Sequence, residues 1–160
     1  MKKNVLILLL LCSIILTFCG CGKNEEQDII TNVANPFVTC NSIQEGVRIS
    51  SIPITVPETL GDFKLDAVTA KSGEMLQLYY VAGEYNLFIR KGFFNLDNLG
   101  DYTKYDEERD YVINGMDVKF GINDNLIYNA TWLNGDYAFF LRSSVGLTED
   151  NFARLIMQVE

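Results

Sequence analysis

The chain of 160 residues is long enough for one domain beyond a targeting segment, and it has a formal net charge of −8 and no histidine. Without Lys2 and Lys3 there remain 11 basic and 21 acidic residues, a net charge of −10, which argues against nucleic acid as a partner because phosphate binding depends on clustered basic side chains. The lack of histidine excludes Ser-His-Asp and Cys-His nucleophile pairs and the HExxH zinc motif.

The first 20 residues have the pattern of a secretory signal peptide. Lys2 and Lys3 give this segment a positive start, and residues 5–18 form an apolar run. A transmembrane helix needs about 20 apolar residues, so the run is better suited to the hydrophobic region of a signal peptide. We therefore expect residues 1–20 to be removed during export.

The end of this run, Phe18-Cys19-Gly20-Cys21, resembles the lipobox of bacterial lipoprotein precursors. In that family an apolar residue and two small residues precede the cysteine that receives the lipid, and Phe18 stands here where leucine is usual. The resemblance implies that Cys21 is acylated and anchors the chain in the lipid bilayer, at the extracytoplasmic face of the cell membrane. Residues 21–35 then form the lipidated cysteine and a flexible tether, and the domain occupies residues 36–160.

Cysteine usage excludes an internal disulfide in the mature chain. Cys12 and Cys19 leave with the signal peptide and Cys21 carries the lipid, so Cys40 is the one thiol that remains. No basic residue lies within several positions of Cys40 to activate it, which favours a small buried side chain over a reactive or intermolecular thiol.

Turn signals divide the domain into short elements. A short helix is expected over residues 42–47, with Asn41 or Ser42 as its N-cap, and Pro53 and Pro57 keep the next stretch extended. The hairpin signal Asn114-Gly115 joins two of the strands that alternating apolar residues predict. These strands cover residues 63–68, 76–80, 87–91, 111–113, 116–120, 126–132 and 137–142.

The chain ends in a predicted amphipathic helix. Thr148 is a suitable N-cap, and a stripe at helical spacing follows it, made of Phe152, Leu155, Ile156 and Val159. The turns between the strands are too short for crossover helices, so the sheet should be antiparallel. The expected fold class is α+β: a single antiparallel sheet of about six to seven strands, a C-terminal helix packed on it and a short N-terminal helix.

Several short motifs lie along the domain: Pro57-Glu58-Thr59-Leu60-Gly61, Gly115, Ala130-Thr131-Trp132 with Gly135 and Tyr137, and Leu147-Thr148-Glu149-Asp150. Together they resemble an extracytoplasmic domain family of unknown function, found in Gram-positive lipoproteins and in the sensor regions of anti-sigma factors. The resemblance covers about residues 53 to 159 and implies an extracytoplasmic module without a catalytic motif.

Acidic residues gather between positions 97 and 110, along the predicted loop and the start of the next strand. Their spacing does not match an EF-hand, and Lys104 and Arg109 interrupt them, so a solvated acidic loop is favoured over a calcium site. No other metal site and no cofactor is expected. The acidic residues are Asp97, Asp101, Asp106, Glu107, Glu108 and Asp110.

The aromatic residues offer the contact candidates. Trp132 alternates in phase with Leu126, Tyr128 and Ala130, which favours a core position over a ligand-binding face. Phe93 and Phe94 adjoin a long predicted loop, and we expect them to contact a protein partner in the cell envelope.

The sequence therefore predicts a membrane-anchored lipoprotein with a noncatalytic binding or sensing module and no catalytic residues. Two alternatives stay open: a histidine-independent cell-envelope hydrolase that uses carboxylates, and a purely structural or immunity-type lipoprotein. The sequence does not identify the ligand or partner.

Overall fold

The computed structural model describes residues 35–93, 99 and 102–160. Its domain, residues 35–160, is built on one antiparallel sheet in which the strand order is β1-β3-β4-β5-β9-β8-β7-β6, with β2 paired to β3. The predicted signal peptide, Cys21 and nearly all of the predicted tether lie outside the described residues.

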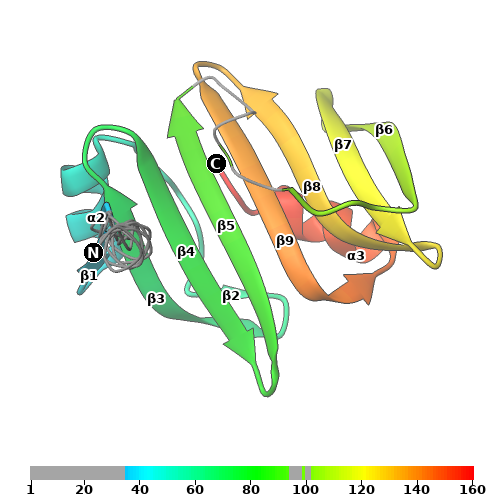
Figure 1. Ribbon diagram of the computed structural model, residues 1–160, viewed down its shortest axis with the longest axis horizontal. Helices are drawn as coiled ribbons and strands as arrows, with labels where there is room; N and C mark the ends of the chain where they lie inside the picture. Colours follow the sequence, from blue (N-terminus) through cyan, green and yellow to red (C-terminus); the bar gives the residue numbers. More distant parts are fainter. Residues whose placement is uncertain (1–34, 94–98, 100–101) are drawn as a thin grey trace, which may run out of the picture. The chain divides into compact units, whose positions relative to one another are not determined.

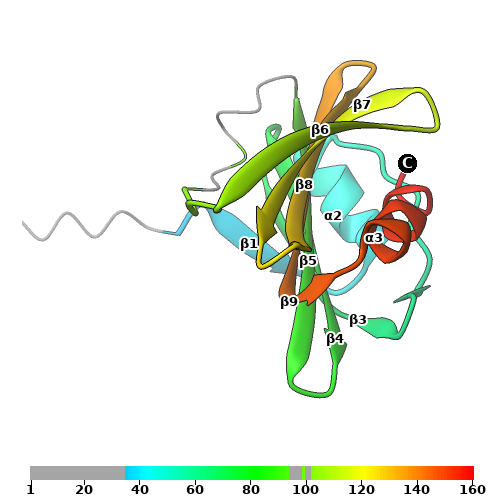
Figure 2. The ribbon, with the colours of Figure 1, turned by 90° about the vertical axis from the view of Figure 1, so that its right-hand side faces the viewer.

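Nine strands and two helices make up the described part of the domain (Figure 1). Both helices lie on the same side of the sheet, which leaves the other side as a helix-free outer face (Figure 2). The elements are β1 (Phe37–Cys40), α2 (Ile43–Ser50), β2 (Thr59–Leu60), β3 (Phe63–Lys71), β4 (Met75–Ala82), β5 (Tyr85–Phe93), β6 (Glu107–Ile113), β7 (Met116–Asn123), β8 (Leu126–Asn134), β9 (Tyr137–Leu147) and α3 (Glu149–Ile156).

The sheet order requires the chain to cross the outer face once. Strand β5 lies in the middle of the sheet and pairs with β9, whereas β6, the next strand in the chain, lies at the far edge. Strands β6 to β9 then form a meander that returns to the middle. Of the connection from β5 to β6, the described residue Leu99 lies on the outer face, where it is buried with Met75, Ala138 and Phe140.

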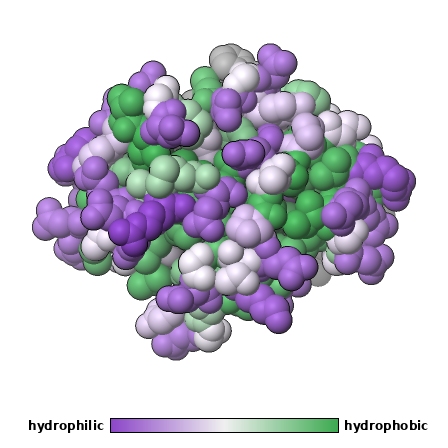
Figure 3. Space-filling view, turned by 180° about the vertical axis from the view of Figure 1, so that it is seen from behind, coloured by the Kyte–Doolittle hydropathy of each residue, from purple (hydrophilic) through white to green (hydrophobic). Residues whose placement is uncertain are grey.

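The main core lies between the sheet and the helices. Phe152 of α3 is fully buried, and its ring centroid lies 5.6 Å from that of Phe120 on β7. On the other half of the sheet α2 approaches so closely that a Cβ atom on Gly46 would lie 2.6 Å from Leu76 Cδ1. On the molecular surface seen from the helix side, hydrophobic residues are exposed in separate places between hydrophilic ones (Figure 3). The predicted antiparallel α+β class and the packing of the C-terminal helix are thus confirmed.

The predicted number of strands was wrong, because the sheet has nine strands instead of six to seven. The missed strands are β1 and β2, both of which pair with β3. Strand β2 has two residues and gives no periodic signal, and in β1 only Cys40 is buried, so neither shows the alternation of a half-buried strand. Short strands of this kind form because an existing strand offers unpaired backbone groups.

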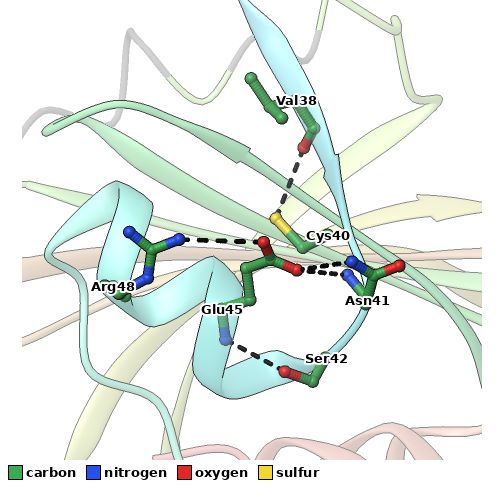
Figure 4. A network of polar contacts seen from close by, with 6 residues as sticks. All are labelled: Val38, Cys40, Asn41, Ser42, Glu45 and Arg48. Carbon is green, nitrogen blue, oxygen red and sulfur yellow. Dashed lines mark hydrogen bonds and ion pairs between the residues drawn. The ribbon is translucent and has the colours of Figure 1, made fainter.

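The first turn of α2 is closed by reciprocal hydrogen bonds (Figure 4). Glu45 N donates to Ser42 Oγ at 3.1 Å, and the Glu45 carboxylate accepts from Asn41 N at 2.8 Å and from Asn41 Nδ2 at 3.0 Å. These bonds hold the pKa of Glu45 below its usual value, with the backbone bond from Asn41 as the main cause. Of the two predicted caps, Ser42 is therefore the N-cap.

Cys40 is part of the same corner of the structure. The side chain is buried, and its Sγ donates to Val38 O at 3.5 Å. Burial raises the pKa of the thiol and Glu45 raises it further, so the neutral form is favoured. The buried position, favoured by the sequence, is confirmed.

Candidate functional site

A groove of about 1110 Å³ runs along the outer face of β7 and β8, beneath the end of the β5–β6 connection. The first register pair of β7 and β8 is Val118–Trp132. Residues 115–117 and 133–135, which lie beyond this pair, also border the groove. Its lining residues are Leu99, Tyr102, Thr103, Tyr105, Glu108, Gly115, Met116, Asp117, Lys119, Phe120, Gly121, Asn129, Thr131, Trp132, Leu133, Asn134, Gly135 and Phe140.

One wall of the groove depends on a glycine. A Cβ atom on Gly121 would lie 2.4 Å from Asn129 Oδ1 and 2.6 Å from Tyr105 Cδ2, so any larger residue would force these groups apart. The Tyr105 ring therefore rests directly on the backbone of β7. The next residue, Asp106, is held by Asn123 Oδ1, which accepts from Asp106 N at 2.8 Å.

Charged residues stand along the open side of the groove. Lys119 Nζ lies 3.6 Å from Glu108 Oε2, and both side chains are more than half exposed. Asp110 is the register partner of Lys119, and Asp117 precedes it by two residues on the same face of β7. Water screens pairs of this kind, so they shape the polarity of the groove more than the stability of the domain.

Tyrosines, amides and hydroxyls make up the rest of the polar lining. Tyr102 is 89% exposed at the rim, and the side chains of Thr131 and Asn129 alternate with buried Ala130 along β8. A wall of this composition can donate and accept hydrogen bonds and can pack flat apolar surface against tyrosine rings. It is suited to holding a polar ligand or a segment of another protein.

A polar network beside Leu99 holds the connection to the sheet. Arg90 donates to the backbone oxygen of Leu99, and its guanidinium lies 4.8 Å from the centroid of the Phe88 ring. In the amide orientation that pairs each donor with an acceptor, Gln77 accepts from Arg90 Nε at 3.1 Å and donates to Tyr79 Oη at 3.0 Å. Arg90 is thus engaged structurally at a point next to the groove.

A second group of residues lies on the helix side, at the ends of β5 and β9. Lys91 is 5% exposed, and its Nζ lies 4.7 Å and 4.6 Å from the ring centroids of Tyr137 and Phe139. Desolvation lowers the pKa of Lys91 to about 8. Phe139 in turn stacks on Trp132 with the ring centroids 5.0 Å apart and the planes at 9°.

The structure describes one of the two expected contact residues, Phe93 and Phe94. Phe93 is 48% exposed and stacks on Tyr137, with ring centroids 5.6 Å apart, so it belongs to the helix-side group and not to the groove. Phe94 lies outside the described residues. Trp132 is buried in the core as the strand pattern predicted, and its Nε1 is the one buried side-chain nitrogen or oxygen without a hydrogen-bond partner in the described part of the chain.

The acidic residues divide between a strand and its flanks. Residues 107–110 belong to the edge strand β6 and not to a loop, and charges on an edge strand discourage pairing with other chains. Glu107 forms an ion pair with Arg109 at 2.6 Å. Within residues 35–93, 99 and 102–160, no group of three or more histidine, cysteine or acidic side chains is placed to hold a metal ion. Asp97 and Asp101 lie outside the described residues.

Among the residues described, no helix has the length and apolarity needed to span a membrane. The fold and the groove together define an α+β domain with one helix-covered face and one grooved face. Comparison of the chain with protein-family models, with curated proteins and with solved structures found no match.

Proposed function

We propose that this chain is a lipid-anchored extracytoplasmic lipoprotein whose domain binds a ligand or a partner protein in the groove on β7 and β8. The groove is the observation that carries the proposal: it is large enough for a small molecule or a peptide segment, and tyrosine, amide and hydroxyl groups line it. The lipobox-like junction at Cys21 supports the location, and the tether over residues 21–35 sets the domain above the membrane.

Binding fits the groove better than hydrolysis does. A carboxylate-based glycoside hydrolase needs two acidic groups facing each other across the substrate, one of them held in protonated form. Of the acidic residues that line the groove, Glu108 has the Lys119 ammonium as its partner and is more than half exposed. The family resemblance over residues 53 to 159 also supports a noncatalytic module.

The anchor is tested by metabolic labelling with a fatty-acid analogue in intact cells. The wild-type chain should take up the label and the variant Cys21→Ala should not, with Cys19→Ala as the matched control that keeps it. Label retained in Cys21→Ala would overturn the lipobox assignment.

The contact surface is tested by placing a photo-crosslinking phenylalanine analogue at one exposed aromatic position at a time. Tyr102 at the groove rim should give a specific adduct, whereas Tyr85, 46% exposed at the β4–β5 turn, should give none. Phe93 is the third position, because it is the contact that the sequence predicts. An adduct at Phe93 alone would move the contact to the helix side, and turnover of cell-wall fragments by the purified domain would favour the hydrolase.

A further inference from the structure

Two nitrogen donors adjoin the same aromatic ring on the helix side. The Lys91 side chain is 5% exposed, the ion pairs of the described residues do not include it, and its ammonium lies against the rings of Tyr137 and Phe139. Lys91 Nζ is not among the fully buried nitrogens that lack a partner, so the ammonium still reaches water, whereas the indole N–H of Trp132, which stacks on Phe139, lacks an acceptor in the described part of the chain. A cation between aromatic rings that still reaches solvent can take an anion as its partner.

The surroundings of Lys91 also provide an apolar surface that reaches solvent. Phe93 stacks on Tyr137 and is 48% exposed, so the rings extend from the Lys91 ammonium along the protein surface. The register pairs Lys91–Phe139 and Phe93–Tyr137 place these four side chains side by side on β5 and β9.

We propose that Lys91, Tyr137, Phe139 and Phe93 form a binding site for a small carboxylate with an apolar body. The carboxylate accepts from the Lys91 ammonium, and the apolar body packs on Tyr137 and Phe93. A monoanion is favoured over a phosphate dianion because one lysine supplies the charge, whereas phosphate sites combine several cations or backbone N–H groups. The lowered pKa of Lys91 is consistent with an ammonium that lacks a counterion in the ligand-free domain.

This site lies on the opposite side of the sheet from the groove and does not depend on the proposed function. The test uses hexanoate as the probe and the fluorescence of Trp132, the one tryptophan of the chain, as the signal. Hexanoate should change the fluorescence of the wild-type domain with saturation below about 10 mM. Acetate, which lacks the apolar body, and hexanol, which lacks the charge, should each bind at least about tenfold more weakly.

The matched variants are Lys91→Met and Lys64→Met. Lys64 is an exposed lysine of β3, remote in register from Lys91, so its loss should leave hexanoate binding unchanged. Lys91→Met should abolish the saturable signal while circular dichroism shows the same fold, and Lys91→Gln provides a second neutral variant if that protein is unstable. Equal hexanoate binding by the folded Lys91 variants, equal binding of hexanol, or no saturation in the wild-type domain would each overturn the site.

Discussion

The two faces of the sheet are built from the same strands but by different means. On the helix side, 23 buried residues join the strands to α2 and α3 in one continuous core. On the outer face the buried apolar cluster has four members among the described residues, and a polar network of Gln77, Tyr79 and Arg90 continues from it. The comparison shows how one face can hold the fold while the other stays open enough to form a groove.

The contrast between the two faces depends on the β5–β6 connection, which crosses the outer face once. Strands β4, β5 and β9 have consecutive buried residues because the helices cover one face and the β5–β6 connection covers part of the other. Strand β6 lies at the edge of the sheet and has only exposed or partly exposed residues. A period of two therefore appears only where one face is solvated.

The largest effect should come from the helix-side core. Phe152→Ala removes a fully buried ring that packs on Phe120, and it should lower the free energy of unfolding by about 3–5 kcal/mol. Denaturant unfolding followed by circular dichroism measures this loss. A loss below about 1 kcal/mol would show that α3 does not stabilise the sheet in solution.

The corresponding change on the outer face should cost less. Leu99→Ala removes a side chain that is 2% exposed but belongs to the four-residue cluster, so a loss of about 2 kcal/mol, at the low end for buried leucine, is expected. The same unfolding experiment gives the comparison directly. If Leu99→Ala cost as much as Phe152→Ala, the two faces would be energetically equivalent and the contrast drawn above would fail.

The sequence predicted the elements whose signals are local. Asn114-Gly115 forms the β6–β7 turn with both residues at positive φ, which is the backbone conformation that this dipeptide favours. The predicted apolar stripe is also buried, although α3 ends at Ile156 and Val159 lies beyond the helix. The charged residues 107–110 show no alternation, so the predicted strand begins only at Tyr111, although backbone pairing with β7 makes them part of β6.

The groove had no signal in the sequence. It exists because the β5–β6 connection crosses three strands and because Gly121 lets Tyr105 rest on β7, and both facts depend on the strand order. Lys91 was missed for a related reason: a lysine at the end of a strand is usually exposed, whereas here the neighbouring rings of β9 cover it. The order of the strands, and not local sequence propensity, thus determines where the candidate sites lie.

A smaller change, this time a gain in stability, is expected when the charge of Lys91 on the helix side is removed. The pKa of Lys91 falls from 10.5 to about 8 on folding, so the unfolded chain holds this proton more tightly. The resulting penalty acts in full below pH 8 and disappears as the pH rises toward 10.5. Lys91→Met should therefore stabilise the domain by about 1–2 kcal/mol at pH 7.

The pH dependence separates this electrostatic penalty from a packing effect. The gain from Lys91→Met should shrink between pH 8 and pH 9.5 in urea unfolding, and a gain independent of pH would assign it to packing. The range stops at pH 9.5 because burial raises the pKa of Tyr80 to about 12, and loss of that tyrosine's proton in the unfolded chain favours unfolding above about pH 10.

The smallest effects concern the starts of the two helices. Ser42 Oγ accepts from Glu45 N at the start of α2, whereas Thr148 makes no side-chain hydrogen bond at the start of α3. Ser42→Ala should cost about 1 kcal/mol, as loss of a working N-cap does, and Thr148→Ala should cost under about 0.5 kcal/mol. Thermal unfolding of the two variants side by side measures the difference. Both helices lie on the helix side, so equal losses would mean that packing against the core, and not the cap, decides where α2 begins.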